Sequence, residues 1–318
     1  MFADASEERL DALAGRLQQR RLQVMVAGEA KRGKSTLVNA LLGRGLLPTG
    51  VTPLTSVVTT VTAAESGVQE HAEVFFDSGT RQRIALARLA DFVTEPGNPG
   101  NAAGVAGVTV YIQSQLLDHH RVDLVDTPGT GSVYAHNTTD ARQALASLDA
   151  AILVLTADPP ISDAERQLLN EISRTSVRTF VLLNKSDRRS PEENHEAEAF
   201  TRRVCSEATR REVTLQSCSA RRGHDDSGFN AFSTALTRYL DTRADHDVQL
   251  ALRGHLTRTL QTMVDSRRVR LRGLELAAEG RTLELKRPAV AAAFRSWQTD
   301  RHQRQVHRLV ETAASGPG

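Results

Sequence analysis

The sequence predicts an α/β domain whose mostly parallel β-sheet is covered by helices on both faces, followed by a purely helical segment. Strand-like apolar runs alternate with helix-like stretches over most of the 318 residues, which is the pattern of parallel strands joined by crossover helices. From about residue 245 the strand signals stop and an i, i+4 row of apolar residues begins. We therefore expect an N-terminal helix over 1–20, the α/β domain over 21–244 and a helical segment over 245–318.

The alternation is visible in the positions of the expected elements. Strand-like runs occupy 22–27, 57–62, 73–76, 108–112, 122–125, 151–155, 179–183 and 212–216. Helix-like stretches occupy 35–42, 84–93, 140–147, 163–173, 191–208 and 229–240. The Pro-, Gly- and Asn-containing stretch 95–107 is expected to form a loop. Hydrophobic residues make up 40% of the chain but aromatic residues only 4%, so aliphatic side chains must fill the core.

The flanking helices carry apolar stripes of their own. Leu10, Leu13 and Leu17 have the spacing of one helix face. The apolar row of the last segment consists of Leu252, Leu256, Leu260, Met263 and Val264. Pro288 should end or kink that helix before a second one over 290–309. We expect the N-terminal helix to dock on the C-terminal helices as a small bundle, and packing on the edge of the sheet is the alternative.

The first expected strand leads into a glycine-rich loop and then into a helix. Residues 28–35 read Gly-Glu-Ala-Lys-Arg-Gly-Lys-Ser, a complete G-x-x-x-x-G-K-S phosphate-binding motif in the context that the motif requires. The N–H groups of such a loop point at a β-phosphate, its lysine reaches the β- and γ-phosphates, and its serine holds Mg²⁺. The candidate nucleotide-binding residues here are Gly28, Glu29, Ala30, Lys31, Arg32, Gly33, Lys34, Ser35 and Thr36.

The segment Asp-Thr-Pro-Gly, residues 126–129, ends another expected strand. The Asp126 carboxylate can hold Mg²⁺ through water, and the Gly129 N–H can contact a γ-phosphate. Ligands of open α/β sheets bind at the carboxyl ends of the strands, where both residues fall. We therefore expect Asp126 and Gly129 to join the phosphate loop in one site.

Two later strand ends distinguish guanine from adenine. Asp187 of Asn-Lys-Ser-Asp (184–187) can accept from both N1–H and N2–H₂ of guanine, a pair of donors that adenine lacks. The stem of Lys185 can lie over the base, and Asn184 can tie the loops together. The backbone of Ser219 and Ala220, which follow the last expected strand, could contact guanine O6.

These residues together resemble those of bacterial dynamin-like proteins. The stretch 47–55, Leu-Pro-Thr-Gly-Val-Thr-Pro-Leu-Thr, looks like their first switch, and Thr55 lies 21 residues after Lys34, where that family places its Mg²⁺-binding threonine. The phosphate loop and the flanking neck-like helices also match, specifically over about 20–225 and only in architecture elsewhere. The resemblance implies Mg²⁺-dependent hydrolysis of GTP to GDP and phosphate. It also implies activation by dimerisation across the nucleotide face, between like or unlike chains, coupled to membrane remodelling.

The resemblance implies a cytoplasmic protein at the inner face of the cell membrane. Lipid contact would involve parts outside this chain, because about 70 residues after 245 cannot build the trunk and tip of the family. No run approaches 18 apolar residues, so we expect no transmembrane helix. The alternative is a regulatory switch GTPase acting in ribosome assembly or signalling without membrane contact. No RNA-binding module is recognised after residue 225, and we expect no nucleic-acid partner.

The catalytic group departs from that of Ras-like enzymes, which place a glutamine directly after the Asp-x-x-Gly motif. Here Thr-Gly-Ser follows, so backbone, switch threonines or a partner must position the water. Lys31 occupies the position at which guanylate-binding proteins and atlastins resemble each other in carrying an arginine finger. We hypothesise that Lys31 supplies catalytic charge without Na⁺ or K⁺, alongside Lys34, Thr55 and Gly129; the alternative is a solvated loop residue. Arg32 is expected to point to solvent or a partner.

The histidine pair His119-His120 precedes an expected strand. The pair lacks further ligands at a metal-binding spacing in the sequence. A surface turn is therefore the favoured interpretation.

Overall fold

The structure, a computed structural model, describes residues 21–50, 57–128, 149–175, 178–209 and 213–278. Within these residues nine strands form one sheet in the order β4-β3-β5-β2-β6-β1-β7-β8-β9. The strands are β1 Leu22–Ala27, β2 Thr59–Ala63, β3 His71–Phe76, β4 Arg81–Ile84, β5 Val105–Ile112, β6 Val122–Asp126, β7 Ala150–Thr156, β8 Arg178–Asn184 and β9 Leu215–Ser217. The fold prediction is confirmed, because the sheet is mostly parallel.

Parallel pairing dominates the half of the sheet that contains β1. Strands β6, β1, β7, β8 and β9 run in one direction, and β2 pairs parallel with β5. The junction between these groups is antiparallel at β2–β6, as are β3–β5 and β3–β4. Strand β1 is therefore central and flanked by parallel neighbours, so the segments that follow β1, β6, β7 and β8 emerge at the same edge.

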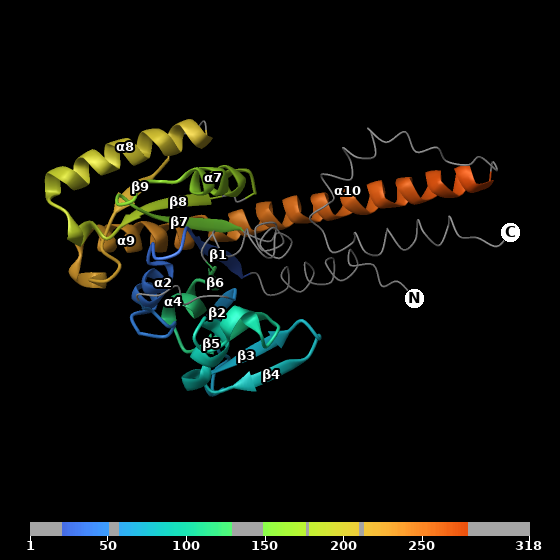
Figure 1. Ribbon diagram of the computed structural model, residues 1–318, viewed down its shortest axis with the longest axis horizontal. Helices are drawn as coiled ribbons and strands as arrows, with labels where there is room; N and C mark the ends of the chain where they lie inside the picture. Colours follow the sequence, from blue (N-terminus) through green and yellow to red (C-terminus); the bar gives the residue numbers. More distant parts are fainter. Residues whose placement is uncertain (1–20, 51–56, 129–148, 176–177, 210–212, 279–318) are drawn as a thin grey trace.

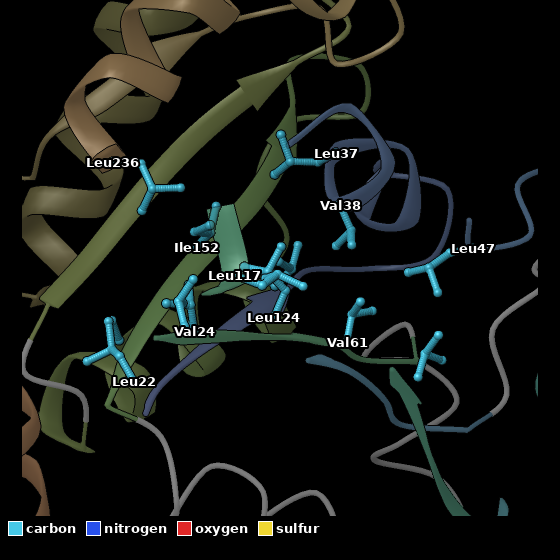
Figure 2. Packing of buried hydrophobic residues seen from close by; sticks show 14 of the residues in the cluster. Leu22, Val24, Leu37, Val38, Leu47, Val61, Leu117, Leu124, Ile152 and Leu236 are labelled. Carbon is cyan, nitrogen blue, oxygen red and sulfur yellow. The ribbon is translucent and has the colours of Figure 1, made fainter. Parts of the chain in front are cut away.

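Helices cover both faces of the sheet, as expected. The helices are α2 Lys34–Leu42, α3 Ala90–Val93, α4 Gln115–His119, α7 Asp163–Thr175, α8 Pro191–Thr209, α9 Ser227–Thr242 and α10 Ala244–Ala278. Successive side chains of a strand point to opposite faces. Leu22 and Val24 of β1 accordingly lie in a core with α2, α4 and α9, whereas Met25 lies in a second core with α7 and α8. Figure 2 shows Leu22 and Val24 beside Leu117 of α4 and Leu236 of α9.

Helix α10 continues from the domain as a long rod that reaches well beyond the sheet (Figure 1). Its first turns belong to the domain, because Val248 and Leu252 are buried in the core that contains α9. Further along, the apolar row is exposed, with Leu256 37%, Leu260 45% and Val264 43% accessible. No helix of the described residues is both long enough and apolar enough to cross a bilayer.

The secondary structure predicted from sequence periodicity was wrong at the β4 edge of the sheet. The expected helix over 84–93 is instead the end of β4 followed by two short helices, η1 Leu86–Arg88 and α3 Ala90–Val93. Strand β4 was not predicted because three of its four residues are exposed and polar, and it pairs only with β3. The expected loop 95–107 ends earlier, since β5 begins at Val105. Helix α4 was also not predicted.

Several expectations lie outside the described residues. These are the helices over 1–20, 140–147 and 290–309, the docking of the first on the last, and the residues Thr55 and Gly129. The division at 244/245 stays a prediction.

Candidate functional site

The phosphate loop (residues 28–35) connects β1 to α2 at the carboxyl edge of the parallel strands. Two of its positions require glycine. Gly28 has φ +142°, and a Cβ there would lie 2.3 Å from the Val154 carbonyl oxygen of β7. Gly33 has φ +97°, and a Cβ there would lie 2.4 Å from Asn184 Nδ2. The loop therefore approaches the ends of β7 and β8 more closely than any side chain permits.

Asn184, the last residue of β8, joins the phosphate loop to the loop after β9. Its Nδ2 donates to the Arg32 carbonyl oxygen at 2.9 Å, and its Oδ1 accepts from the Ala220 N–H at 2.9 Å. The side chain is buried, so both hydrogen bonds are shielded from water. The expectation that Asn184 ties the loops together is met.

Lys185 makes a second connection to the phosphate loop. Its Nζ donates to the Lys31 carbonyl oxygen at 2.5 Å. Both residues have left-handed backbone, with φ 63° at Lys185 and φ 65° at Lys31. This conformation is uncommon outside glycine and typical of functional loops. The Lys31 side chain is exposed at the tip of the loop.

Arg32 does not point to solvent, which corrects the prediction. It is 2% exposed, and its guanidinium forms a two-pronged ion pair with Glu165 of α7, Nε to Oε1 at 2.8 Å and Nη2 to Oε2 at 2.7 Å. It also donates to the Pro159 carbonyl oxygen at 2.6 Å and to the Thr156 hydroxyl. Arg32 therefore anchors the phosphate loop to the end of β7 and the start of α7.

The partner carboxylate, Glu165, was missed by sequence reasoning. Its carboxylate accepts from the N–H groups of Glu29 at 3.2 Å and Ser162 at 3.1 Å, and its own N–H donates to Ser162 Oγ. Ser162 and Glu165 have the S-x-x-E spacing of a capping box, which is a readable signal. That signal predicts a helix start but says nothing of Arg32, which lies 133 positions away.

Lys34 lies inside the loop. Its Nζ donates to the Glu29 carbonyl oxygen at 2.9 Å, and the side chain is buried. Burial lowers its pKa below the ordinary value, and the carboxylates of Asp126 and Glu165 act in the opposite direction. The Lys34 ammonium group therefore lies within the loop, where the motif predicts contact with phosphate oxygens. Ala30 is exposed, and Thr36 is half-buried in the first turn of α2.

Ser35 and Asp126 fit a hard cation such as Mg²⁺. The Ser35 hydroxyl donates to Asp126 Oδ2 at 2.6 Å, and Asp126 Oδ1 is buried without a hydrogen-bond partner. Burial raises the pKa of Asp126 to about 6, against the opposing effects of Ser35 and Lys34. A buried carboxylate oxygen with an open coordination position, next to a hydroxyl, is the oxygen-donor set that Mg²⁺ prefers.

The expected base-binding residues lie beside this loop. Burial alone would raise the pKa of Asp187, but neighbouring donors and the cations Arg222 and Arg188 outweigh it, and the pKa is lowered. The lowered pKa favours the ionised Asp187 carboxylate, which accepts hydrogen bonds through both oxygens. The side chain of buried Ser219 is one of the donors to Asp187, and the Ser219 N–H donates to Asp226 Oδ1 at 3.1 Å. Because the Ala220 N–H already serves Asn184, a contact from Ala220 to O6 would share or replace that bond.

Comparison with known proteins shows which family contains this site. The family model described as "Dynamin family" matches residues 24–186, about half of the chain. A protein of Caldicellulosiruptor from the xynA 3′ region is 37% identical over 212 residues, 65% of this chain and 52% of that protein. The bacterial dynamin-like protein of Nostoc punctiforme is 28% identical over 186 residues, 54% of this chain and 26% of that protein.

One solved structure shares the fold. It is described as an oligomerised bacterial dynamin pair. It matches with a TM-score of 0.59 and 16% sequence identity, and the match covers 87% of this chain and 47% of that chain. The chain thus spans about half the length, or less, of these relatives.

Proposed function

The chain belongs to the dynamin family of GTPases, and on this premise we propose that it binds GTP with Mg²⁺ and hydrolyses it in a reaction activated by dimerisation. The observation that carries the proposal is the Asn184 clasp, which holds the phosphate loop against the loop after β9. A nucleotide with its phosphates on the first loop would then meet Asp187 with its base. The segments 21–244 and 245–318 act as GTPase domain and neck.

Ser35 and Asp126 would hold Mg²⁺, Asp126 through water, and Thr55 would complete the set. The ion neutralises charge on the β- and γ-phosphate oxygens. Lys34 moves from the Glu29 carbonyl to the phosphates, and the Gly129 N–H contacts the γ-phosphate. Asp187 selects guanine, because adenine would leave its carboxylate oxygens without N–H partners.

Lys31 supplies positive charge to the transition state. Support comes from its exposed position on the loop and from its carbonyl, which Lys185 holds in place. Removing a preorganised charge or donor of this kind typically costs on the order of 10²-fold in kcat. We expect that loss in Lys31→Ala, partial recovery in Lys31→Arg, and equal turnover in Na⁺, K⁺ and choline buffers. Equal turnover of Lys31→Ala and the unaltered chain would rule the role out.

Assembly with a second chain is supported by a structure with the same fold, which is described as an oligomerised bacterial dynamin pair for the sensing and tethering of membranes. Contact across the nucleotide face is our proposal. Membrane contact would be made at the inner face of the cell membrane.

GTP turnover measured against protein concentration tests the function. Turnover per molecule should rise with concentration if dimerisation activates hydrolysis. A flat response would favour the regulatory switch GTPase, and turnover of ATP equal to that of GTP would contradict the role of Asp187. Co-sedimentation with liposomes tests membrane contact separately.

A further inference from the structure

A second polar cluster lies on the opposite edge of the sheet from the phosphate loop. His119 is the last residue of α4, His120 follows it just before β6 begins, and Asp241 lies in the last turn of α9. His120 Nδ1 and Asp241 Oδ1 are 3.1 Å apart. The two imidazole rings are perpendicular, with centroids 4.7 Å apart. One ligand atom from each residue lies within 4.8 Å of the other two. We call these three residues the His–Asp cluster.

The electrostatics of the His–Asp cluster favour a cation. Asp241 adds a negative charge to a helix end that already carries partial negative charge, and the last turn of α9 contains no basic residue. An aspartate in that position is unfavourable unless a positive group faces it. The charges that act on His120 come from Asp241 and His119. Asp241 faces the imidazole of His120, a side chain that commonly binds metal ions through a ring nitrogen.

The geometry of the ligand atoms is close to that of a metal site. Zn²⁺ binds imidazole nitrogen and carboxylate oxygen at about 2.0–2.2 Å, which separates neighbouring tetrahedral ligand atoms by roughly 3.3 Å. The 3.1 Å between His120 Nδ1 and Asp241 Oδ1 is the length of a hydrogen bond and is also close to this value, so a bound ion would replace the proton between the two atoms, which is released to water. Rotation of the exposed His119 side chain would bring in the third ligand, and water would take the fourth position.

We propose that His119, His120 and Asp241 form a binding site for a divalent transition metal of the Zn²⁺ class. A bound ion would join the end of α4 to the last turn of α9. Arg243 alone separates α9 from α10, so the ion would fix the base of the long helix relative to the sheet. The site is separate from the Ser35–Asp126 pair, which is an oxygen-donor set at the other edge.

Zinc binding to the full chain tests this proposal. The protein is freed of metal with a chelator, transferred to buffer with excess Mg²⁺ and GDP, and titrated with Zn²⁺ by calorimetry, with bound metal counted by elemental analysis. His120→Ala and Asp241→Asn should lose one equivalent of zinc. Since even indirect ligand supports are worth 10–100-fold in metal affinity, a direct ligand should cost at least about 10-fold. His195→Ala, an exposed histidine on α8, is the matched control and should bind as the unaltered chain does.

A second readout protects against misfolded variants. Zn²⁺ should raise the melting temperature of the unaltered chain and of His195→Ala, but not of His120→Ala or Asp241→Asn, since a ligand that binds only the folded state stabilises it. GTP turnover with Mg²⁺ should stay unchanged in all variants. Zinc binding that is equal in the unaltered chain, His120→Ala and Asp241→Asn would overturn the proposal, as would failure of the unaltered chain to bind zinc at micromolar concentration.

Discussion

Replacing Arg32 by methionine should destabilise the protein far more than replacing a second, similar-looking arginine. Both Arg32 and Arg44 form two-pronged ion pairs with a glutamate, Glu165 and Glu70 respectively. The side chains of the first pair are 3% and 0% exposed, whereas those of the second are 42% and 25% exposed. The comparison therefore varies burial while the pairing chemistry stays the same.

The expected magnitudes follow from that difference. Arg32→Met leaves the Glu165 carboxylate buried without its cation, and it leaves the Pro159 carbonyl with only the longer hydrogen bond from the Thr156 hydroxyl, at 3.4 Å, which together should cost about 3–5 kcal/mol. A domain of this size loses about 2–4 °C of melting temperature per kcal/mol, so the expected fall is roughly 6–20 °C. Arg44→Met should cost about 0–1 kcal/mol, because water screens the exposed pair.

Denaturant unfolding of the nucleotide-free protein measures both values, and the double variant Arg32→Met/Glu165→Gln completes a cycle. The Glu29 and Ser162 N–H groups donate to different oxygens of Glu165, so a glutamine would keep an acceptor for one of them only, but it would carry no charge, and the double variant should recover part of the loss. An Arg32→Met variant no less stable than Arg44→Met would contradict a stabilising role of the buried ion pair. It would mean that Arg32 is solvated in the folded protein.

Three further predictions concern the same domain. Gly33→Ala should weaken GDP binding at least about 10-fold, because the added Cβ would meet Asn184. The control Gly43→Ala, at φ +66° with no atom within 4 Å, should cost only about 1–2 kcal/mol of stability. Equal GDP affinities of the two variants would contradict this prediction. Asp187→Asn should weaken GTP binding by about 10²–10⁴-fold and favour xanthosine triphosphate, whose C2 carbonyl matches the new amide donor, as competition assays would show. The hydrogen bond from Arg44 lowers the pKa of Glu70, so the stabilisation from this pair is present above the unfolded pKa of about 4.3 and is lost as the pH falls through the lower folded pKa. The stability difference between the unaltered chain and Arg44→Met should therefore vanish in acid; a difference that is constant from pH 7 to pH 2 would exclude the ion pair as its source.

The central parallel strands β1, β7 and β8 were predictable because each contains a short apolar run. Strand β7, for example, is buried along its whole length and reads as an uninterrupted apolar stretch in the sequence. Strand β4 carries no such signal, because its exposed residues are stabilised by pairing with β3 rather than by burial. The helix expected from Ile84 onward does not form because Ile84 is the last residue of β4 and is buried there.

The candidate site divides in a similar way. Gly28, Gly33, Lys34 and Ser35 were identified from the sequence because the phosphate loop folds through its own backbone conformation and neighbouring residues. The ion pair between Arg32 and Glu165, which anchors this loop, was not predicted, because the sequence around Arg32 contains nothing that distinguishes a solvated arginine from a buried one.

The phosphate loop and its place at the carboxyl edge of a mostly parallel sheet are predictable from the residues alone, because glycine spacing and apolar periodicity are local properties. The burial of Arg32 against Glu165 and the position of Asp241 beside His119 and His120 become visible only in the folded chain. Each of these contacts joins residues more than a hundred positions apart, and it exists only because strands and helices that are distant in the chain pack side by side.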